Sequence, residues 1–237
     1  MVTPARIFCQ SECFLEKRCI SYNLGPVLGQ NRSCELNAAD HSTRPDSLVN
    51  RAGYEYCPIQ NPCQSNPCPG EILCTPDFSW NTYKCDGCKN SLPLGMEDGR
   101  IPDENITASS FFRKKNIYRP SFGRLRTNGR TWSADTGNAG EYIQIDLDVI
   151  KFITMVATQG RDTSHNQWVT KYSLSYSLNA KDWKAYEEDG VKIFSGNKDR
   201  NTVVTNKLER PIKSRHIRLI VKEFHNHISL RMELYGC

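Results

Sequence analysis

The sequence predicts a mainly β protein in which small disulfide-stapled modules precede one larger β-domain. Ten of the 11 cysteines lie between Cys9 and Cys88, and the last is the final residue, Cys237. Between Cys88 and Cys237 the chain has no cysteine and contains short runs in which apolar and polar residues alternate, the pattern of half-buried strands. About 150 residues of this kind suit one sandwich or barrel.

Composition and cysteine usage indicate the compartment. Of the 237 residues 38% are hydrophobic and 24% charged, which is typical of a soluble globular protein. The sequence contains no run of 18 apolar residues, the length that a membrane-spanning helix needs. The first residues lack the apolar core of an export signal. Closely spaced cysteines nevertheless indicate disulfides, which persist in oxidising compartments. We therefore expect an extracellular protein, secreted or at the cell surface, whose natural N-terminus precedes Met1.

Two further features bear on the compartment. The triplets that begin at Asn31 and Asn105 are acceptor sequences for N-glycosylation, which agrees with export. The alternative is a cytosolic zinc protein, for which the only support is the pair Cys85 and Cys88. No second close pair at ribbon-like spacing accompanies it, so we expect no metal site and no cofactor.

Residues 1–57 form the first expected module. Its cysteines follow the spacing C-x3-C-x5-C-x14-C, and the stretch CFLEKRCISYNL…CELN resembles the PAN/apple family, in which a short helix is stapled to a strand. The resemblance implies the pairs Cys9–Cys34 and Cys13–Cys19 in a partial α+β module that lacks its first strand. It also leaves Cys57 as the odd thiol, unpaired within this chain.

Residues 58–87 form the second expected module. The spacing C-x4-C-x5-C-x10-C resembles the first four cysteines of an EGF-like module, in a truncated copy without the closing hairpin. The resemblance implies the pairs Cys63–Cys74 and Cys68–Cys85. The acidic pattern of calcium-binding EGF modules is missing. So short a chain needs such staples, because its own core is too small.

Residues 88–237 form the expected β-domain. Turn residues such as Asn128-Gly129 and Asp189-Gly190 separate its strand-like runs. These runs are 141–147, 151–160, 170–177, 191–196, 216–222 and 228–234. The last two carry the C-terminus into a sheet, so we expect Cys237 to bond Cys88 and join the two ends of the domain. Closing a loop of about 150 residues removes on the order of 5 kcal/mol of unfolded-state entropy.

The same segment resembles the factor V/VIII type C, or discoidin, domain family. The resemblance rests on PLGMEDGRIPDENITASS (93–110), GEYIQIDL (140–147), TQG (158–160), YSLSYSLNAKDW (172–183), FSGNKDRNT (194–202) and RHIRL…ISLRMELYGC. It implies a jelly-roll-like β-barrel with three loops at one end as the binding surface. Members of the family bind phosphatidylserine membranes, glycans or protein termini.

One stretch of the domain is strongly basic. Residues 113–130, RKKNIYRPSFGRLRTNGR, carry +7 and no acidic residue, against +5 for the whole chain, so the remainder carries −2. Aromatic and aliphatic residues are interleaved with the cations. Basic residues mixed with apolar ones suit an anionic, amphiphilic target. The alternative is a solvated loop whose aromatic residues face the core.

The discoidin resemblance places this stretch on the first two binding loops and Gly160–Gln167 on the third. The candidate ligand-binding residues are Phe112, Arg113, Lys114, Lys115, Ile117, Tyr118, Arg126, Arg130, Arg161 and His165. The first loop offers Lys114-Lys115-Asn116-Ile117 where lipid-binding relatives expose Trp or Leu. A sulfated glycan is therefore an alternative to a membrane.

Catalysis is not expected. The sequence has none of the motifs G-x-S-x-G, H-E-x-x-H, G-x-x-x-x-G-K-[ST] or G-x-G-x-x-G. His225 and His227 could share a metal, but we interpret them as polar residues before the last strand. Nothing places a serine against His165.

The sequence thus favours an adhesion or recognition protein whose partner is an anionic phospholipid surface or a glycan. The alternative is a structural matrix component that binds extracellular-matrix or cell-surface proteins. Nucleic acid is not expected as a partner, because of the compartment.

Overall fold

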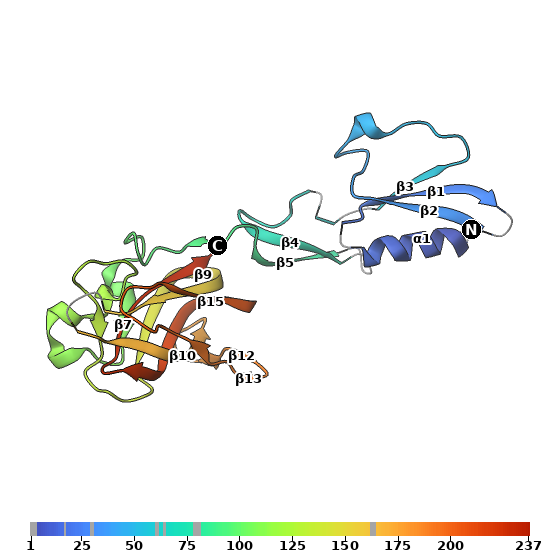
Figure 1. Ribbon diagram of the computed structural model, residues 1–237. Helices are drawn as coiled ribbons and strands as arrows, with labels where there is room; N and C mark the ends of the chain where they lie inside the picture. Colours follow the sequence, from blue (N-terminus) through green and yellow to red (C-terminus); the bar gives the residue numbers. More distant parts are fainter. Residues whose placement is uncertain are drawn as a thin grey trace. The chain divides into compact units, whose positions relative to one another are not determined.

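The computed structural model describes residues 4–16, 18–28, 31–59, 62–63, 65–77, 82–161 and 165–237. The chain divides into two compact units. The first comprises residues 1–69 and 74–85, and the second comprises residues 70–73 and 86–237 (Figure 1). The strands predominate, which confirms the predicted mainly β class. Within the described residues, no helix is both long enough and apolar enough to cross a membrane.

In the first unit a helix lies against a three-stranded antiparallel sheet of order β2-β1-β3 (Figure 1). The elements are α1 (Pro4–Leu15), β1 (Ser21–Leu28), β2 (Asn31–Asn37), η1 (Pro45–Ser47) and β3 (Glu55–Pro58). Disulfides join Cys9 to Cys34 and Cys13 to Cys19, so that α1 is fastened to β2. Among the described residues, the buried cluster between helix and sheet contains Tyr22, Leu24 and Ile59 besides cysteines. So small a core depends on its staples.

Cys57 on β3 is a buried free thiol. Burial raises its pKa, because desolvation disfavours the thiolate. The other ten cysteines form five disulfides in the structure.

Asp40 organises the turn that follows β2. Its carboxylate oxygen Oδ1 accepts hydrogen bonds from the hydroxyl of Ser42 (2.7 Å), the hydroxyl of Thr43 (2.8 Å) and both backbone amides, at 3.1 and 2.8 Å. The Ser42 hydroxyl makes the largest contribution, and together these bonds hold the pKa of Asp40 down to about 2. The turn is therefore stabilised by the ionised carboxylate.

We expect the first unit to lose stability in acid through Asp40. Because the folded-state pKa is depressed to about 2, the stabilisation is present above the unfolded-state pKa near 3.9 and is lost as the pH falls towards 2. Asp40→Asn keeps an acceptor oxygen but does not titrate. The difference in unfolding free energy between parent and variant should shrink between about pH 4 and 2, measured in urea by NMR signals of β1 to β3. A difference that stays constant with pH would contradict this role.

A hairpin of β4 (Ile72–Asp77) and β5 (Thr82–Cys88) follows. Disulfides attach the preceding segment to it, from Cys63 to Cys74 and from Cys68 to Cys85. Residues 78–81 lie outside the described part of the chain.

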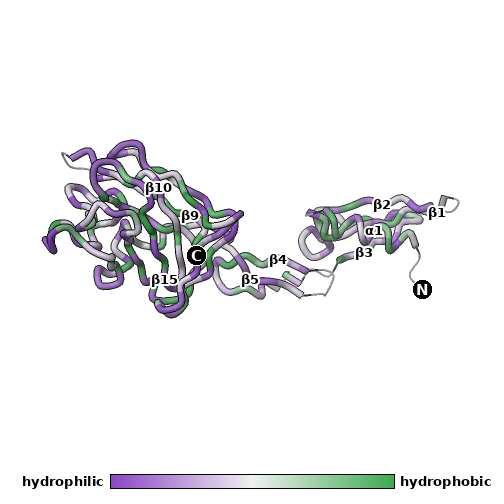
Figure 2. The backbone as a smooth tube through the Cα atoms, turned by 90° about the horizontal axis from the view of Figure 1, so that it is seen from below, coloured by the Kyte–Doolittle hydropathy of each residue, from purple (hydrophilic) through white to green (hydrophobic). Residues whose placement is uncertain are grey.

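The second unit is a nine-stranded antiparallel assembly around one large apolar core. Its strands are β6 (Leu92–Pro93), β7 (Ile106–Ala108), β8 (Trp132–Ser133), β9 (Tyr142–Gln159), β10 (Trp168–Ser177), β11 (Lys184–Ala185), β14 (Phe194–Ser195), β15 (Val204–His225) and β16 (Ser229–Gly236), with β12 (Glu187–Glu188) and β13 (Gly190–Val191) as a separate small hairpin. Short 3-10 helices connect them: η2 (Asp103–Asn105), η3 (Phe112–Lys114), η4 (Asn116–Tyr118) and η5 (Pro120–Phe122). Along the strands hydrophobic and hydrophilic segments alternate, as expected when one face of each strand meets the core (Figure 2).

Three predicted strand boundaries in this unit are wrong. The runs 141–147 and 151–160 form one 18-residue strand, β9, that bends at Asp148, where φ is 67°. Both halves of β9 pair with β15, so the ladder continues across the bend. β15 begins at Val204, well before the predicted 216, and the predicted strand 191–196 contributes only short pieces of β13 and β14. Tertiary pairing with β9, rather than local alternation, extends β15.

The last strand differs from the prediction in its burial. Alternation predicts that β16 has one polar, exposed face, but Ser229, Arg231 and Glu233 are all buried. The Glu233 carboxylate accepts hydrogen bonds from the backbone amides of Met96 (3.1 Å) and Glu97 (2.9 Å). The polar face of β16 therefore ties surrounding segments to the strand instead of facing water.

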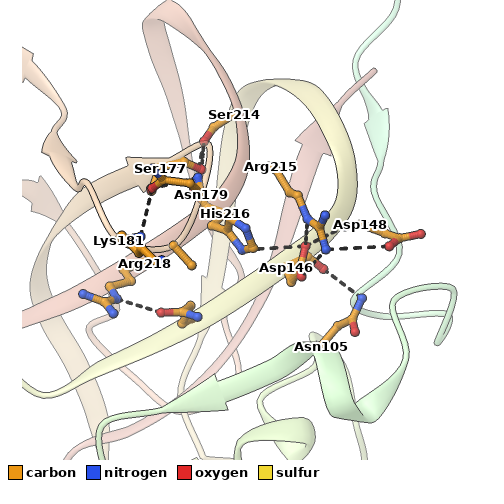
Figure 3. A network of polar contacts seen from close by, with 12 residues as sticks. Asn105, Asp146, Asp148, Ser177, Asn179, Lys181, Ser214, Arg215, His216 and Arg218 are labelled. Atoms are coloured by element: carbon orange, nitrogen blue, oxygen red, sulfur yellow. Dashed lines mark hydrogen bonds and ion pairs between the residues drawn. The ribbon is translucent and has the colours of Figure 1, made fainter.

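Asp146 joins β9 to β15 near the bend. Its carboxylate accepts two parallel hydrogen bonds from Arg215, at 2.7 and 2.8 Å, and its backbone carbonyl accepts one from the side-chain amide of Asn105 (Figure 3). The Arg215 hydrogen bond is the main reason why the pKa of Asp146 lies below its usual value. A glycan at Asn105 would need to release this amide, whereas Asn31 is exposed at the start of β2.

The two ends of the second unit meet at a disulfide between Cys88 and Cys237. The backbone amide of Cys237 also donates to the carbonyl of Phe152, and the Phe152 amide donates back. The terminal cysteine is thus held both by its sulfur and by a β-ladder.

Candidate binding surface

One end of the second unit gathers several connections, which we call the loop end. It comprises residues 111–118, 124–130, 134–141, 160–161, 165–168 and 225–229. β10 begins there at Trp168, β15 ends there at His225 and β16 begins there at Ser229. All ten of the predicted ligand-binding residues belong to these connections.

The segment 112–118 has an unusual backbone. Arg113 and Lys114 both adopt left-handed conformations, with φ of 49° at each. Such a conformation costs about 1 kcal/mol or more per non-glycine residue, so the surroundings must hold it. The amide of Arg113 donates a 2.6 Å hydrogen bond to the Asp135 carboxylate, and the amide of Lys114 donates to the carbonyl of Phe111. The fold therefore fixes two consecutive cations at an exposed turn.

A group of polar side chains supports Asp135. Its amide donates to the hydroxyl of Ser110 (2.9 Å), and that hydroxyl donates to the Glu141 carboxylate (2.8 Å). Burial alone would raise the pKa of Glu141, but hydrogen bonds from Ser109, Thr136 and Ser110 together lower it. An ionised Glu141 thus sits beneath the turn that presents Arg113.

Aromatic side chains bind the first loop to its neighbours. The ring of Phe112 meets Tyr118 edge to face at 5.4 Å and His227 at 5.6 Å. The guanidinium of Arg161, from the third loop, lies 5.2 Å from the ring centre of Tyr118. Phe112 and Tyr118 are half-buried, so they hold the loops together beneath the surface.

The third loop is held from β15. Trp168 stacks on His225, with ring centres 4.2 Å apart, and the side-chain amide of Asn226 donates to the carbonyl of Asn166 (2.7 Å). His165 is exposed, whereas residues 162–164 lie outside the described part of the chain. Across the described residues, no group of three or more histidine, cysteine or acidic side chains could hold a metal ion.

Arg231 of β16 connects three loops from below. Only 2% of this residue is exposed, and its guanidinium donates to the backbone carbonyls of Gly160 (2.7 Å), Thr127 (2.9 Å) and Arg200 (3.2 Å). These carbonyls lie in three separate connections. Arg231 therefore fixes the second and third binding loops relative to the sheet.

The cations of the basic stretch fall into two groups. Arg119 and Arg124 both bind Asp103, at 3.0 and 2.6 Å, and Arg126 binds Glu97. These three cations are paired with two acidic residues, one of them shared, that the sequence analysis did not associate with them. Within the described residues, the other four have no carboxylate within ion-pair distance: Arg113, Lys114, Lys115 and Arg130. Lys114 and Lys115 shortly precede Ile117, whose surface is 59% exposed.

Sequence reasoning missed the residues that position the surface. Asp135, His227 and Arg231 lie 22 or more residues after Arg113 in sequence. Their types and spacing carry no local signal, because each acts through a contact that only the tertiary fold creates. Arg231 in particular has the sequence appearance of a solvent-facing strand residue.

Comparison with known proteins agrees with this architecture. A model of the F5/8 type C domain family matches residues 105–234. Lactadherin of Rattus norvegicus is 39% identical over 172 residues, which cover 69% of this chain and 40% of that protein. Coagulation factor V of Bos taurus is 42% identical over 160 residues, 64% of this chain and 7% of that protein.

Among solved structures, wild-type discoidin II from Dictyostelium discoideum is similar, with 32% identity and a TM-score of 0.51 over 56% of this chain and 54% of that chain. The present chain therefore spans well under two thirds of the length of each of these relatives. The family model covers more than half of the chain, including every strand from β7 to β15 and most of β16. The chain belongs to the F5/8 type C domain family.

Proposed function

We propose that this is an extracellular adhesion or recognition protein whose F5/8 type C domain binds an anionic phospholipid membrane through its loop end. Modules that resemble PAN/apple and truncated EGF-like domains precede it. The extracellular assignment is supported by the disulfides of both units, which persist in oxidising compartments. The domain acts as a binding module, and no enzymatic role is proposed for it.

One observation carries the membrane proposal: the first loop presents three cations without ion pairs and an exposed aliphatic side chain. Arg113, Lys114 and Lys115 have no ion pair among the described residues, and Ile117, two residues after Lys115, is 59% exposed. Cations attract an anionic headgroup layer, and a neighbouring aliphatic tip gains by entering the acyl boundary.

The loop is also held in shape before any ligand arrives. The Asp135 hydrogen bond and the ring contacts of Phe112 fix the turn, so little ordering accompanies binding. The guanidinium of Arg126, by contrast, forms an ion pair with the Glu97 carboxylate. We expect it to contribute less than the three cations of the first loop.

Replacing Arg113, Lys114 and Lys115 together with serine is expected to weaken membrane binding about a hundredfold. Each cation near an anionic membrane contributes roughly 1 kcal/mol, and about 3 kcal/mol corresponds to two decades of affinity. The measurement is co-sedimentation with phosphatidylserine vesicles, beside retention on a heparin column. Parent binding should fade between about 50 and about 300 mM salt, because exposed charges are screened.

The matched control replaces Lys151, Lys181 and Lys207 with serine. These lysines lie elsewhere on the domain, and their replacement removes the same net charge as the loop variant does. Its vesicle binding should stay close to that of the parent. If the loop variant and the control behave alike, the loop end is not the membrane site. Binding to neither vesicles nor heparin would favour the matrix-component alternative.

Changing Ile117 to serine separates lipid from glycan. Insertion of an aliphatic tip matters only where there is an acyl layer to receive it, so vesicle affinity should fall several-fold, on the order of 1 to 2 kcal/mol, while heparin retention stays unchanged. Equal losses on both ligands, or a loss on heparin alone, would instead identify a sulfated glycan as the ligand.

A further inference from the structure

A second concave site lies at the far end of β10 from the loop end. It has a volume of about 400 Å³ and is lined by Tyr176, Leu178, Asn179, Asp182, Lys184 and Lys213. β10 has 10 residues, so its Trp168 end and its Ser177 end are roughly 30 Å apart. This turn pocket is therefore separate from the loop end, and a ligand bound there is independent of the proposed membrane binding.

We propose that the turn pocket binds an acidic saccharide, with Lys184 and Lys213 holding its anionic group. Lys184 follows the turn on β11 and Lys213 lies on β15. Neither ammonium has a carboxylate within ion-pair distance among the described residues. Two unpaired cations facing one concavity favour an anionic ligand.

The wall of the pocket is rigid. The Asn179 side-chain oxygen accepts hydrogen bonds from the amide of Lys181 at 2.9 Å and the hydroxyl of Ser177 at 3.0 Å (Figure 3). It also accepts one from the amide of Asp182, at 2.9 Å. Its amide group donates to the Asp182 carboxylate (2.8 Å). A turn fixed in this way loses little freedom when a ligand binds.

The opposite wall is fixed from β15. The buried hydroxyl of Ser214 donates to the carbonyl of Ser177 (2.6 Å), which holds the bulge next to Lys213 against the end of β10 (Figure 3). The ammonium of Lys213 lies 5.5 Å from the ring centre of Phe152. Lys213 therefore stands on an ordered piece of strand and not on a loop tip.

The remaining groups distinguish a saccharide from a simple anion. The Asp182 carboxylate would repel a bare sulfate or phosphate, but it can accept hydrogen bonds from sugar hydroxyls with the lone pairs that Asn179 leaves open. The half-buried ring of Tyr176 packs on the core and offers an apolar surface to the C–H groups of a pyranose ring. Its hydroxyl has no hydrogen-bond partner among the described residues. Cations, a hydroxyl acceptor and an aromatic ring together match a sugar that carries a sulfate or carboxylate.

The test is isothermal titration calorimetry of the full chain at low salt with a sulfated, uronate-containing heparin disaccharide. Changing Lys184 and Lys213 together to serine should weaken binding about a hundredfold, because each charge-assisted contact is worth about a decade or more. Lys181→Ser removes a charge from the same turn but not from the lining, and should stay within about twofold of the parent. Its backbone amide, which bonds Asn179, is retained.

Two comparison ligands complete the experiment. The unsulfated, N-acetylated disaccharide should bind more weakly than the sulfated one but more tightly than inorganic sulfate. Inorganic sulfate that binds as tightly as the disaccharide would overturn the saccharide assignment. Disaccharide affinity that is unchanged in the double variant would place the ligand elsewhere and overturn the site.

Discussion

Replacing Cys88 and Cys237 together with serine is expected to lower the free energy of unfolding of the second unit by about 5 kcal/mol. The bond closes a loop between residues 149 positions apart, so its loss gives the unfolded chain much more conformational freedom. The folded state should change little, because the amide and carbonyl of Cys237 remain paired with Phe152. Urea unfolding followed by tryptophan fluorescence measures the loss, since Trp132, Trp168 and Trp183 all belong to this unit.

The control is the double serine variant of Cys63 and Cys74. It also removes one disulfide, but from the first unit and with a sequence separation of only 11. The tryptophan transition should stay where it is in the parent. A shift of the same size in both variants would show that the effect is not due to closure of the β-domain.

Changing Arg231 to methionine is expected to destabilise the second unit by about 3 to 5 kcal/mol. The variant keeps the volume of the side chain but leaves the carbonyls of Gly160, Thr127 and Arg200 without their donor. Each poorly solvated carbonyl that loses its partner costs about 1 kcal/mol or more. At about 2 to 4 °C per kcal/mol for a domain of this size, the melting temperature should fall by roughly 10 °C.

Arg210→Met is the matched control. Arg210 is exposed, and its guanidinium donates to one backbone carbonyl, that of Glu187, at 2.7 Å. Its loss should cost well under about 1 kcal/mol, because water replaces the hydrogen bond. If both variants lower the melting temperature by the same amount, the hydrogen bonds of Arg231 do not hold the loops in place. Where Arg231→Met remains folded, its vesicle binding should also weaken, since loop positions depend on this side chain.

Several features could be predicted because a short stretch of sequence is enough to indicate them. Alternation in 170–177 and 228–234 predicts strands that the structure contains as parts of β10 and β16. The basic stretch is visible from composition alone. Prediction failed where a strand depends on its partner: the first residues of β15 have weak alternation, yet they pair with β9 from Val204 onwards. Short-range pattern does not report such pairing.

The charges of the candidate surface also divide into what the sequence predicts and what depends on residues distant in the chain. From the sequence, all seven cations of residues 113–130 look equivalent. The structure separates them, because Asp103 binds Arg119 and Arg124 while Glu97 binds Arg126. Both carboxylates precede the stretch by many residues, so no local window associates them with it. The available charge is therefore smaller than the sequence suggests, and it is concentrated on the first loop and Arg130.

By itself the sequence determined the mainly β class, the family of the large domain and the presence of a basic, amphiphilic segment. These follow from alternation, motif and composition, which act over a few residues or over the whole chain. Only the tertiary structure decided which cations remain unpaired, that Asp135 holds Arg113 and Lys114 in left-handed conformations, and that Arg231 is buried. Hydrogen bonds and ion pairs act over only a few ångströms in space, and in a β-domain the residues that meet at that distance come from strands far apart in the chain.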